Sequence, residues 1–488
     1  MTRATPFFQG FSSILFGSPR LSGLDSCLRK LRNLNSLSDF FDTFQFLIPH
    51  TLLHRSNKGV NSRQRLFSTH VTFWAFLIQT MAPATSCRDV LRKVQAWWAS
   101  RSSAQILHST STCAYTKARK RLAIEVISPI ATHITAHLEK RVTKTQLWCG
   151  RKVRVVDGTT ASMPDTPENQ ERYPQSKSQS PGCGFPLMRI VAIFSLASGA
   201  LLHYAKSNKH VHESILFTSM IRLLEKGDVL LADRGFCSFT SFWRMKCAGI
   251  DAVMRLNGVR KVDFLKGKKL GANDFLLTWK KPTQRPKECS QEEFAALPKE
   301  MMLRHTTITV SARGHRTQSM VIVTTLLDPI AYSVESLGKL YFERWSVELR
   351  FREIKITLGM DILRCKTPDM VEKEVLMHTI SYNLVRAIMQ QAASENQVDL
   401  GRISFKGTVD TMRSWSAQIE AARGKPNKQK ELIATMNEII AKDQLPLRPD
   451  REEPRVKKRR PKNYQLMTAP RHEMKYHGHR NRPSKSLS

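Results

Sequence analysis

Two aspartates follow short apolar stretches that have the composition of β-strands. Asp157 follows residues 153–156, and Asp233 follows the wholly apolar residues 229–232. In open α/β sheets, ligands gather beyond the carboxyl ends of the strands, so side chains at that edge are placed for chemistry. Two carboxylates that meet there repel each other unless a cation lies between them, and hard carboxylate oxygens suit Mg²⁺ or Mn²⁺. Taken alone, either aspartate could simply start a turn.

A third set of polar residues is spaced for one face of a helix predicted over residues 333–358. Tyr341, Arg344, Glu348 and Lys355 project within an arc of about 60° if each residue turns the helix by about 100°. Apolar residues are expected on both flanks of this stripe, which favours the edge of a cleft within packed protein. A ladder of surface ion pairs, Arg344 with Glu348, is the simpler alternative.

The stripe is too long to surround one ion, because residues 341–355 span about 21 Å at about 1.5 Å per residue. Glu348 could therefore join Asp157 and Asp233 on metal, while Arg344 and Lys355 follow a phosphate backbone on either side. Tyr341 could stack or donate to a phosphate oxygen. Three carboxylates that hold two metal ions are suited to in-line phosphoryl transfer.

The same residues carry a family resemblance. The spacing Tyr-(2)-Arg-(3)-Glu-(6)-Lys, from Tyr341 to Lys355, resembles the signature of bacterial DDE transposases of the insertion-sequence-4 family. The motifs at 157–160 (Asp-Gly-Thr-Thr) and 233–236 (Asp-Arg-Gly-Phe) are similar to the acidic motifs of that family, and Asn383 and Arg386 are similar to its helix after the signature. The similarity runs from about residue 61 to 471.

The resemblance implies an RNase H-like catalytic core, a β-rich insertion before the glutamate helix, and Asp157, Asp233 and Glu348 as the metal-binding triad. It also implies that Tyr341, Arg344 and Lys355 contact transposon-end DNA. Two Mg²⁺ ions per site are expected, and Mn²⁺ could substitute. The implied reaction is cleavage at terminal inverted repeats followed by strand transfer, possibly through hairpin ends, by a homodimer on paired ends. In some relatives an aromatic residue of the insertion holds a flipped base; Trp279 is the candidate, although a buried core Trp is equally compatible.

The elements around these residues predict an α/β protein with a mixed sheet. A strand, a hairpin at 189–205, a helix, the strand 229–232, a further helix and a strand follow one another. The expected divisions are a leader over 1–60, a helical DNA-binding domain over 61–148, the first part of the core over 149–255, and a β-rich insertion over 256–328. The glutamate helix and the helix after it follow over 329–395, a C-terminal helical region over 396–447, and a basic tail over 448–488.

A basic helix within the N-terminal helical domain is a candidate DNA contact. Residues 114–122 follow a cluster of Ser and Thr suited to capping a helix, and they include Lys117, Arg119, Lys120 and Arg121. A solvated basic face that binds nothing is the alternative interpretation of this segment.

The composition favours a polyanionic partner. The 488 residues include 77 Lys and Arg against 41 Asp and Glu, a formal net charge of +36, and neutralising phosphates releases condensed counterions. No run of about 18 apolar residues suggests a membrane span. Nine scattered Cys without a CxxC pair indicate a reducing compartment, so a cytoplasmic protein is expected. The resemblance implies that it is bacterial and associated with the nucleoid. The rival hypotheses are a catalytically inactive protein that still binds DNA ends, and an RNase H-like nuclease without strand transfer.

Overall fold

A computed structural model describes residue 48, residue 53, and residues 66–82, 85–99, 109–310, 318–422, 425–446, 466–470 and 472–474. The chain forms two compact units. The smaller comprises Met1–Gln79, Thr85–Leu122 and Met412–Met436; the larger comprises Thr80–Ala84, Ala123–Thr411 and Asn437–Ser488. Most of the leader predicted over 1–60 and of the tail predicted over 448–488 lies outside the described residues.

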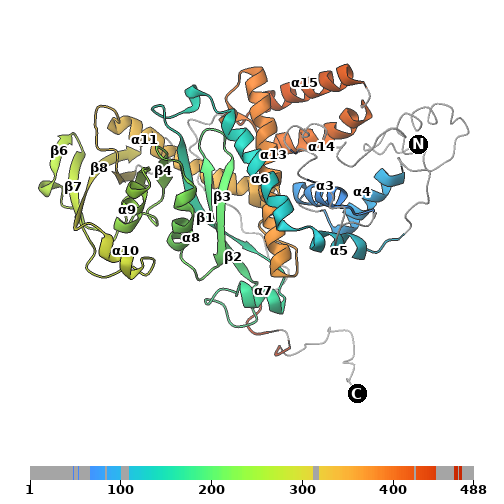
Figure 1. Cartoon of the computed structure of the whole chain (residues 1–488), viewed down its shortest axis with the longest axis horizontal. Helices are drawn as coiled ribbons and strands as arrows, with labels where there is room; N and C mark the ends of the chain where they lie inside the picture. The colour runs from blue at the N-terminus through green and yellow to red at the C-terminus, as the bar shows by residue number, and fades with distance from the viewer. Residues whose placement is uncertain are drawn as a thin grey trace, which may run out of the picture. The chain divides into compact units, whose positions relative to one another are not determined.

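The smaller unit is helical, as predicted. It contains most of α3 (Thr69–Met81), α4 (Cys87–Ala99) and α5 (Cys113–Arg121). The expected helical domain, however, extended to residue 148. Helix α6 (Ile124–Lys140) belongs instead to the larger unit, where it packs along α13 (Pro368–Asn396), as Figure 1 shows. The apolar positions of α6, Ile127, Ile130 and Ile134, are fully buried, which explains why this helix is part of the core.

The larger unit is built on one nine-stranded sheet with the order β3-β2-β1-β4-β5-β9-β8-β7-β6. Strands β1 (Val153–Ser162), β2 (Leu187–Ser195) and β3 (Leu201–Asn208) are antiparallel neighbours. Strands β4 (Val229–Ala232) and β5 (Asp251–Arg255) then add in parallel to β1. This mixed order confirms the predicted RNase H-like core. Strand β4 is wholly apolar and β5 is apolar at its three middle residues, because helices cover both faces of the sheet.

The predicted insertion supplies the remaining four strands: β6 (Lys268–Gly271), β7 (Asp274–Lys280), β8 (Glu300–Val310) and β9 (Gln318–Thr324). Strand β9 pairs antiparallel with β5, so the insertion extends the core sheet. Inside it, the fully buried Arg304 guanidinium contacts the Asp274 carboxylate at 2.7 Å. This paired charge fixes the register of β7 on β8.

Each face of the core sheet has its own helices. Val156 of β1 shares a buried cluster with Leu216 and Phe217 of α8 (Glu213–Met220) and Phe242 of α9 (Phe239–Cys247). Phe194 of β2 contacts Phe351 and Tyr382 on the opposite face, at centroid distances of 5.3 and 6.0 Å. These belong to α12 (Ser346–Arg352) and α13. The described chain also contains α7 (Pro167–Arg172), α10 (Gln291–Ala296), α14 (Phe405–Ala421) and α15 (Pro426–Lys442).

The single helix predicted over 333–358 is interrupted. Helix α11 (Val334–Phe342) passes into a 3₁₀ turn (Glu343–Trp345), α12 follows, and a π-helical turn (Glu353–Thr357) ends the segment. The uniform rotation of about 100° per residue therefore does not hold across the stripe. Departures of this kind from α geometry are frequent at functional sites.

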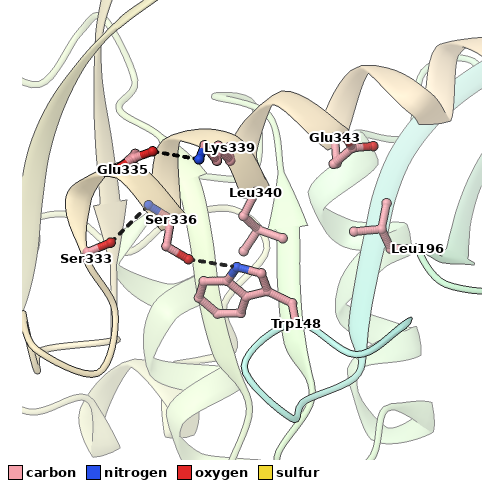
Figure 2. Close-up of a pocket in the computed structure, with 8 residues that line it drawn as sticks. All are labelled: Trp148, Leu196, Ser333, Glu335, Ser336, Lys339, Leu340 and Glu343. Carbon is pink, nitrogen blue, oxygen red and sulfur yellow. Dashed lines mark hydrogen bonds and ion pairs between the residues drawn. The ribbon is translucent and has the colours of Figure 1, made fainter. Parts of the chain in front are cut away.

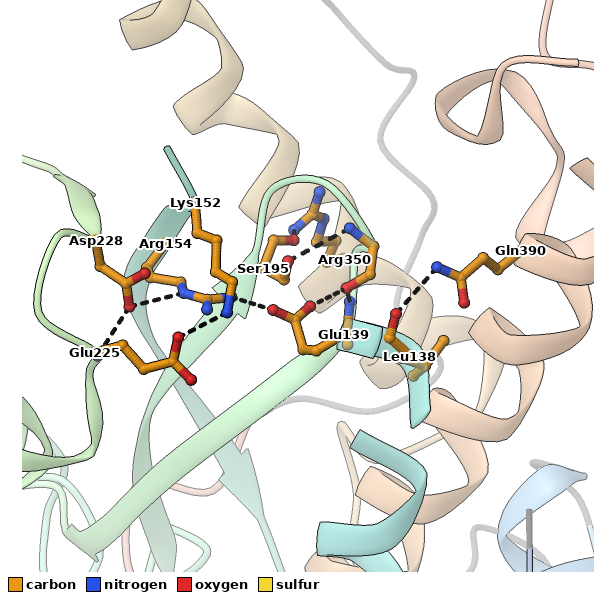
Figure 3. Close-up of polar contacts among 11 residues, drawn as sticks. Leu138, Glu139, Lys152, Arg154, Ser195, Glu225, Asp228, Arg350 and Gln390 are labelled. Atoms are coloured by element: carbon orange, nitrogen blue, oxygen red, sulfur yellow. Dashed lines mark hydrogen bonds and ion pairs between the residues drawn. The ribbon is translucent and has the colours of Figure 1, made fainter. Parts of the chain in front are cut away.

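A buried ionic cluster joins α6 to the sheet (Figure 3). The Arg154 guanidinium in β1 contacts Asp228 at 3.0 Å and also pairs with Glu139 of α6. Glu139 in turn accepts a hydrogen bond from Ser198 in the β2–β3 turn. Burial opposes the charge of Glu139, but Arg154 and the hydrogen bonds outweigh it and lower the pKa of that carboxyl.

The turn between β2 and β3 is held by α13. Arg386 donates to the Ser198 carbonyl at 3.0 Å, and Asn383 pairs with both backbone groups of Leu201 at 2.9 Å. Gly199 has φ +72°, and its missing Cβ leaves the space that the Arg386 guanidinium fills. The two residues singled out after the signature therefore brace the hairpin.

Among the helices in the described part of the chain, none combines the length and apolarity that crossing a bilayer requires.

Candidate active site

The two aspartates meet at one edge of the sheet, by a route that differs in part from the prediction. Asp233 directly follows β4, as expected. Asp157, however, lies inside β1, opposite Ala192 of β2. The parallel pairing of β1 with β4 ends at Val155 and Leu231. Asp157 therefore lies in the part of β1 that extends beyond its pairing with β4.

Backbone amides hold both carboxylates. The Gly158 N–H donates to Asp157 Oδ1 at 2.8 Å, and the Gly235 N–H donates to Asp233 Oδ1 at 2.7 Å. Because side chains alternate along a strand, Asp157 faces the α12 side of the sheet and Gly158 faces the α8 side. The Glu213 carboxylate occupies the space beside Gly158, where a Cβ would lie 2.4 Å from it. Glu213, the first residue of α8, therefore lies behind the site.

The surroundings of Asp157 disfavour its ionised form, an effect that a bound cation would offset. Burial raises the pKa of Asp157 to about 6; the Gly158 N–H and Arg344 oppose this shift, while the charges of Asp233 and Glu213 reinforce it. A carboxylate that is costly to ionise, beside two further acids, gains from a nearby positive charge.

Arg344 joins Asp157 to the glutamate helix. Its Nη1 lies 3.6 Å from Asp157 Oδ2, and its Nη2 lies 3.5 Å from Glu348 Oε1. Both contacts are longer than the roughly 2.7–2.9 Å typical of charge-assisted hydrogen bonds. The buried Arg344 Nε has no hydrogen-bond partner within the described structure. Arg344 therefore retains donor capacity for an anion.

The other signature residues differ in exposure. Tyr341 is 2% exposed, and burial raises its pKa to about 12, so its hydroxyl stays protonated and can donate. The Glu348 side chain is 60% exposed. Lys355 Nζ contacts Asp361 Oδ1 at 2.9 Å. Asp361 lies beyond the predicted helix, so the spacing of the signature does not predict this contact.

Only one of the two predicted apolar flanks is buried. Leu340, Phe351 and Leu358 pack in the core, whereas Leu349 and Ile356 are 47% and 63% exposed. The stripe thus lies at the border between core and surface, and the prediction of two packed flanks is wrong. Arg350, on the same helix, is buried and donates to the Ser195 and Leu196 carbonyls.

Trp279 is a core residue, and the structure does not support its assignment to a flipped base. Its side chain is 4% exposed, its Nε1–H donates to His305 Nε2 at 2.9 Å, and its ring contacts Phe242 edge to face. The Arg260 guanidinium covers the ring at 3.9 Å from the centroid. Strand alternation places Trp279 on the inner face of β7, a pattern visible in its sequence.

Arg119 is also unsuited to its predicted role. It is 9% exposed, donates to Gln79 Oε1 at 3.2 Å, and lies over the rings of Phe76 and Tyr115. It stabilises the small helical unit from within. Lys117 and Lys120 are exposed and Arg121 is half-buried, so the DNA contact predicted for these three stays a prediction.

The acids suit a divalent cation by their chemistry. They are oxygen donors of the type that Mg²⁺ prefers. Among the described residues, no three His, Cys, Asp or Glu side chains already lie close enough to surround an ion. Glu348 is the exposed member of the triad, so a metal-bound arrangement would require its side chain to approach the two aspartates.

A separate pocket of about 420 Å³ lies along α11 (Figure 2). Four of its polar side chains pair with one another: Trp148 Nε1–H donates to Ser336 Oγ at 3.1 Å, and Lys339 contacts Glu335 at 2.6 Å. None of the three acids lines it. The pocket therefore offers no convergent reactive groups.

Comparisons with known proteins agree with this geometry. A family model described as "Transposase DDE domain" matches residues 148–384. Transposase InsG for insertion sequence element IS4, from Escherichia coli (strain K12), is 28% identical over 361 residues, which cover 73% of this chain and 78% of that protein. The transposase for insertion sequence element IS421, from Escherichia coli, is 32% identical over 82 residues, 17% of this chain and 21% of that protein.

A solved structure of a piggyBac transposase synaptic complex with hairpin DNA covers 85% of this chain and 84% of that chain, at a TM-score of 0.41 and 10% identity, which is too distant to support an argument. The domain match, by contrast, spans Asp157, Asp233 and the whole glutamate helix, and the similarity to the IS4 protein extends over most of both chains. Residues 148–384 therefore match a transposase DDE domain, and the chain is similar to an insertion-sequence-4 transposase over most of both chains.

Proposed function

We propose that this transposase cuts DNA at the terminal inverted repeats of its insertion sequence and joins the freed ends to target DNA, with Asp157, Asp233 and Glu348 as the acids that hold two Mg²⁺ ions. One observation carries this assignment: the Arg344 guanidinium contacts both Asp157 and Glu348, at 3.6 and 3.5 Å, on the side of β1 that adjoins the strand end bearing Asp233.

The reaction is two transfers of a phosphoryl group. Water attacks the phosphodiester at the transposon end, a new P–O bond forms, and the bond to the departing strand breaks to leave a 3′-OH. This 3′-OH attacks a phosphodiester of target DNA, and the target P–O3′ bond breaks to free a target 3′-OH. Where the 3′-OH first attacks the opposite strand to form a hairpin, the flanking DNA departs, and a second water opens the hairpin and regenerates the 3′-OH. Bound divalent ions supply Lewis acidity and lower the pKa of water.

The chain's own residues bind and orient the DNA. Arg344 and Lys355 are suited to phosphate oxygens, and the protonated Tyr341 hydroxyl is a neutral donor. The aspartates must be ionised to bind a cation, which the raised pKa of Asp157 makes dependent on pH. A homodimer that pairs two ends, and a location with the bacterial nucleoid in the cytoplasm, form part of this proposal.

Cleavage of end DNA tests the proposal. An Asp157→Ala variant should bind a labelled duplex that carries the terminal repeat as tightly as the wild type does, and should leave it uncut at any Mg²⁺ or Mn²⁺ concentration. Cleavage by this variant at the wild-type rate would show that the site is assigned wrongly.

Two alternatives give different results in the same assay. A protein that only occupies transposon ends would bind but never cut in the wild-type form. A nuclease would cut without producing joined transposon–target molecules, which gel analysis of a target plasmid detects. Imperfect inverted repeats and short direct duplications in the DNA around the gene would also support transposition.

A further inference from the structure

The chain leaves the catalytic edge of the sheet through a strongly basic segment, residues 255–269, which we call the basic loop. It contains six Lys or Arg and a single acid, Asp263. The loop begins where β5 ends, and β5 is the parallel neighbour of β4, with Met254 opposite Ala232. Because parallel strands end at the same edge, the loop emerges beside Asp233.

Short-range interactions tie the loop to the turn after Asp233. The Asn257 backbone interacts with the Cys237 thiol, and Arg260 lies near enough to influence that thiol electrostatically. Arg255 acts in the same way on the Tyr341 hydroxyl, on which Asp233 also acts. The first half of the loop therefore adjoins both the second acidic motif and the first signature residue.

The loop has distinct inner and outer sides. Two side chains anchor it: Arg260 lies over the Trp279 ring at 3.9 Å, and Phe264 packs on Phe275 at a centroid distance of 5.2 Å. Two apolar side chains point outward instead, since Val259 is 89% and Leu265 is 97% exposed. The other exposed residues are Gly258, the single acid Asp263 and four lysines, Lys261, Lys266, Lys268 and Lys269.

Most of this outward charge is not neutralised locally. Lys266 pairs with Asp263 at 3.4 Å. Within the part of the chain that the structure describes, no ion pair forms for Lys261, Lys268 or Lys269. A rigidly anchored segment that presents unneutralised lysines around exposed apolar side chains fits a polyanion with accessible apolar surface, as DNA grooves and bases have.

We propose that the basic loop is a DNA-binding element that follows the duplex away from the phosphodiester that is cut, with Lys261 on phosphates near the site, Lys268 and Lys269 of the edge strand β6 on phosphates farther along, and Leu265 against the groove or an unstacked base. The inference rests on the proposed function for the position of the DNA. It supplies the insertion with a DNA contact in place of Trp279, which is buried.

A simpler role for two of the lysines must be separated from this one. Strand β6 is the edge of the sheet, and exposed lysines on an edge strand discourage pairing with another chain. Substitution by Gln removes the charge while it keeps polarity and most of the side-chain length. Because the charge also protects the edge, the aggregation state of the variant is measured together with its DNA binding.

The first experiment compares two double variants of equal charge. Lys268→Gln/Lys269→Gln removes two lysines of the loop. Lys144→Gln/Lys226→Gln removes two exposed lysines that precede β1 and β4, on the opposite edge of the sheet. Affinity for end DNA is measured by fluorescence anisotropy from ~50 to ~300 mM salt, without divalent metal.

The loop variant should bind roughly tenfold or more weakly near ~0.1 M salt, and the slope of log K against log [salt] should fall by about two, because each lost phosphate contact contributes about 0.9. The control should keep the wild-type slope. The proposal is overturned if the loop variant and the control variant show the same salt slope. It is also overturned if the loop variant aggregates while its monodisperse fraction binds end DNA with unchanged affinity.

The second experiment locates the loop on the DNA. A photoreactive benzophenone residue replaces Leu265, which is exposed enough for the substitution to spare the fold, and primer extension maps the cross-links on end DNA. Cross-links within a few base pairs of the cleavage site support the proposal. Cross-links only to protein, or only to distant DNA, overturn it.

The results of these two experiments can refute the inference about the loop without refuting the proposed function, and the reverse is also true. If wild-type protein binds but never cuts, the catalytic proposal falls, while the salt slopes still report on the loop. If wild-type protein cuts and the loop variant keeps its slope, only the inference about the loop falls.

Discussion

At the scale of single residues, the site is defined by an aspartate that is expensive to ionise. Burial raises the pKa of Asp157 to about 6, and the neighbouring Asp233 and Glu213 raise it further against the opposing Gly158 N–H and Arg344. Without a cation, the folded protein therefore tolerates a charge at this position poorly. This cost gives a measurable signature in stability as well as in catalysis.

We expect Asp157→Asn to stabilise the metal-free protein at pH 8. The folded-state pKa lies above the unfolded value of about 3.9, so wild-type stability falls as pH rises between these values, and the variant escapes that loss. The gain should be about 1–2 kcal/mol above pH 6, after an allowance for partial exposure, and should vanish near pH 4. Urea denaturation in EDTA measures it.

A matched control is Asp263→Asn on the exposed surface, which should show no such gain. A destabilised Asp157→Asn variant at pH 8 would contradict the account of the site's electrostatics.

Arg344 should set the pH range of cleavage. It lowers the pKa of Asp157, so Arg344→Ala should raise that pKa and move the acidic limb of the cleavage-rate profile to higher pH, besides weakening binding to end DNA. Rates at saturating DNA between pH 5.5 and 8.5 report the shift. Arg344→Lys keeps the charge and should leave the limb nearer its wild-type position; an identical limb in wild type and Arg344→Ala would refute the role.

At the scale of elements, the core depends on the buried cluster that Figure 3 shows. Arg154 links β1 to Asp228, which precedes β4, and to Glu139 of α6. Asp157 lies on the same strand, so this cluster holds the element that carries the first of the proposed metal-binding acids.

Asp228→Ala should destabilise the protein by about 2–3 kcal/mol, because Arg154 would keep only one acid at a site where an unpaired charge is costly. Glu225→Gln is the matched control: its contact with Lys152 is largely exposed, and the expected change is under about 0.5 kcal/mol. Urea denaturation midpoints compare the two. Equal midpoints would show that Arg154 does not depend on Asp228.

The glutamate helix shows where periodicity stops predicting structure. The predicted stripe requires an unbroken α-helix. In the structure, a 3₁₀ turn contains Arg344 and a π-helical turn contains Lys355. These local changes of pitch decide that Arg344 turns inward between two acids while Glu348 stays exposed.

At the scale of the whole molecule, charge dominates the encounter with DNA. A formal charge of +36 predicts steep weakening of end binding between ~50 and ~200 mM salt, by about 10³-fold or more if six or more phosphates are neutralised. Anisotropy titrations at fixed pH measure the slope. A flat response would remove the electrostatic argument, and a neutral polymer at the same osmolality controls for excluded volume.

The sequence by itself determined which residues are proposed to carry the chemistry and most of the elements that hold them. Apolar runs predicted β4, the β2–β3 hairpin and the long helix α13, because burial on two faces or on one stripe leaves a periodic trace. The order of these elements sufficed for the mixed sheet, and the spacing from Tyr341 to Lys355 for the family resemblance.

Only the tertiary structure decided which basic and aromatic side chains are available to a ligand. Arg119, Arg350 and Trp279 have residue types that bind nucleic acid, yet packing partners distant in sequence bury each of them. Asp361 pairs with Lys355, and α6 joins the catalytic unit, through contacts that no local pattern records. Exposure and partner choice depend on residues far along the chain, and for that reason a single sequence leaves them open.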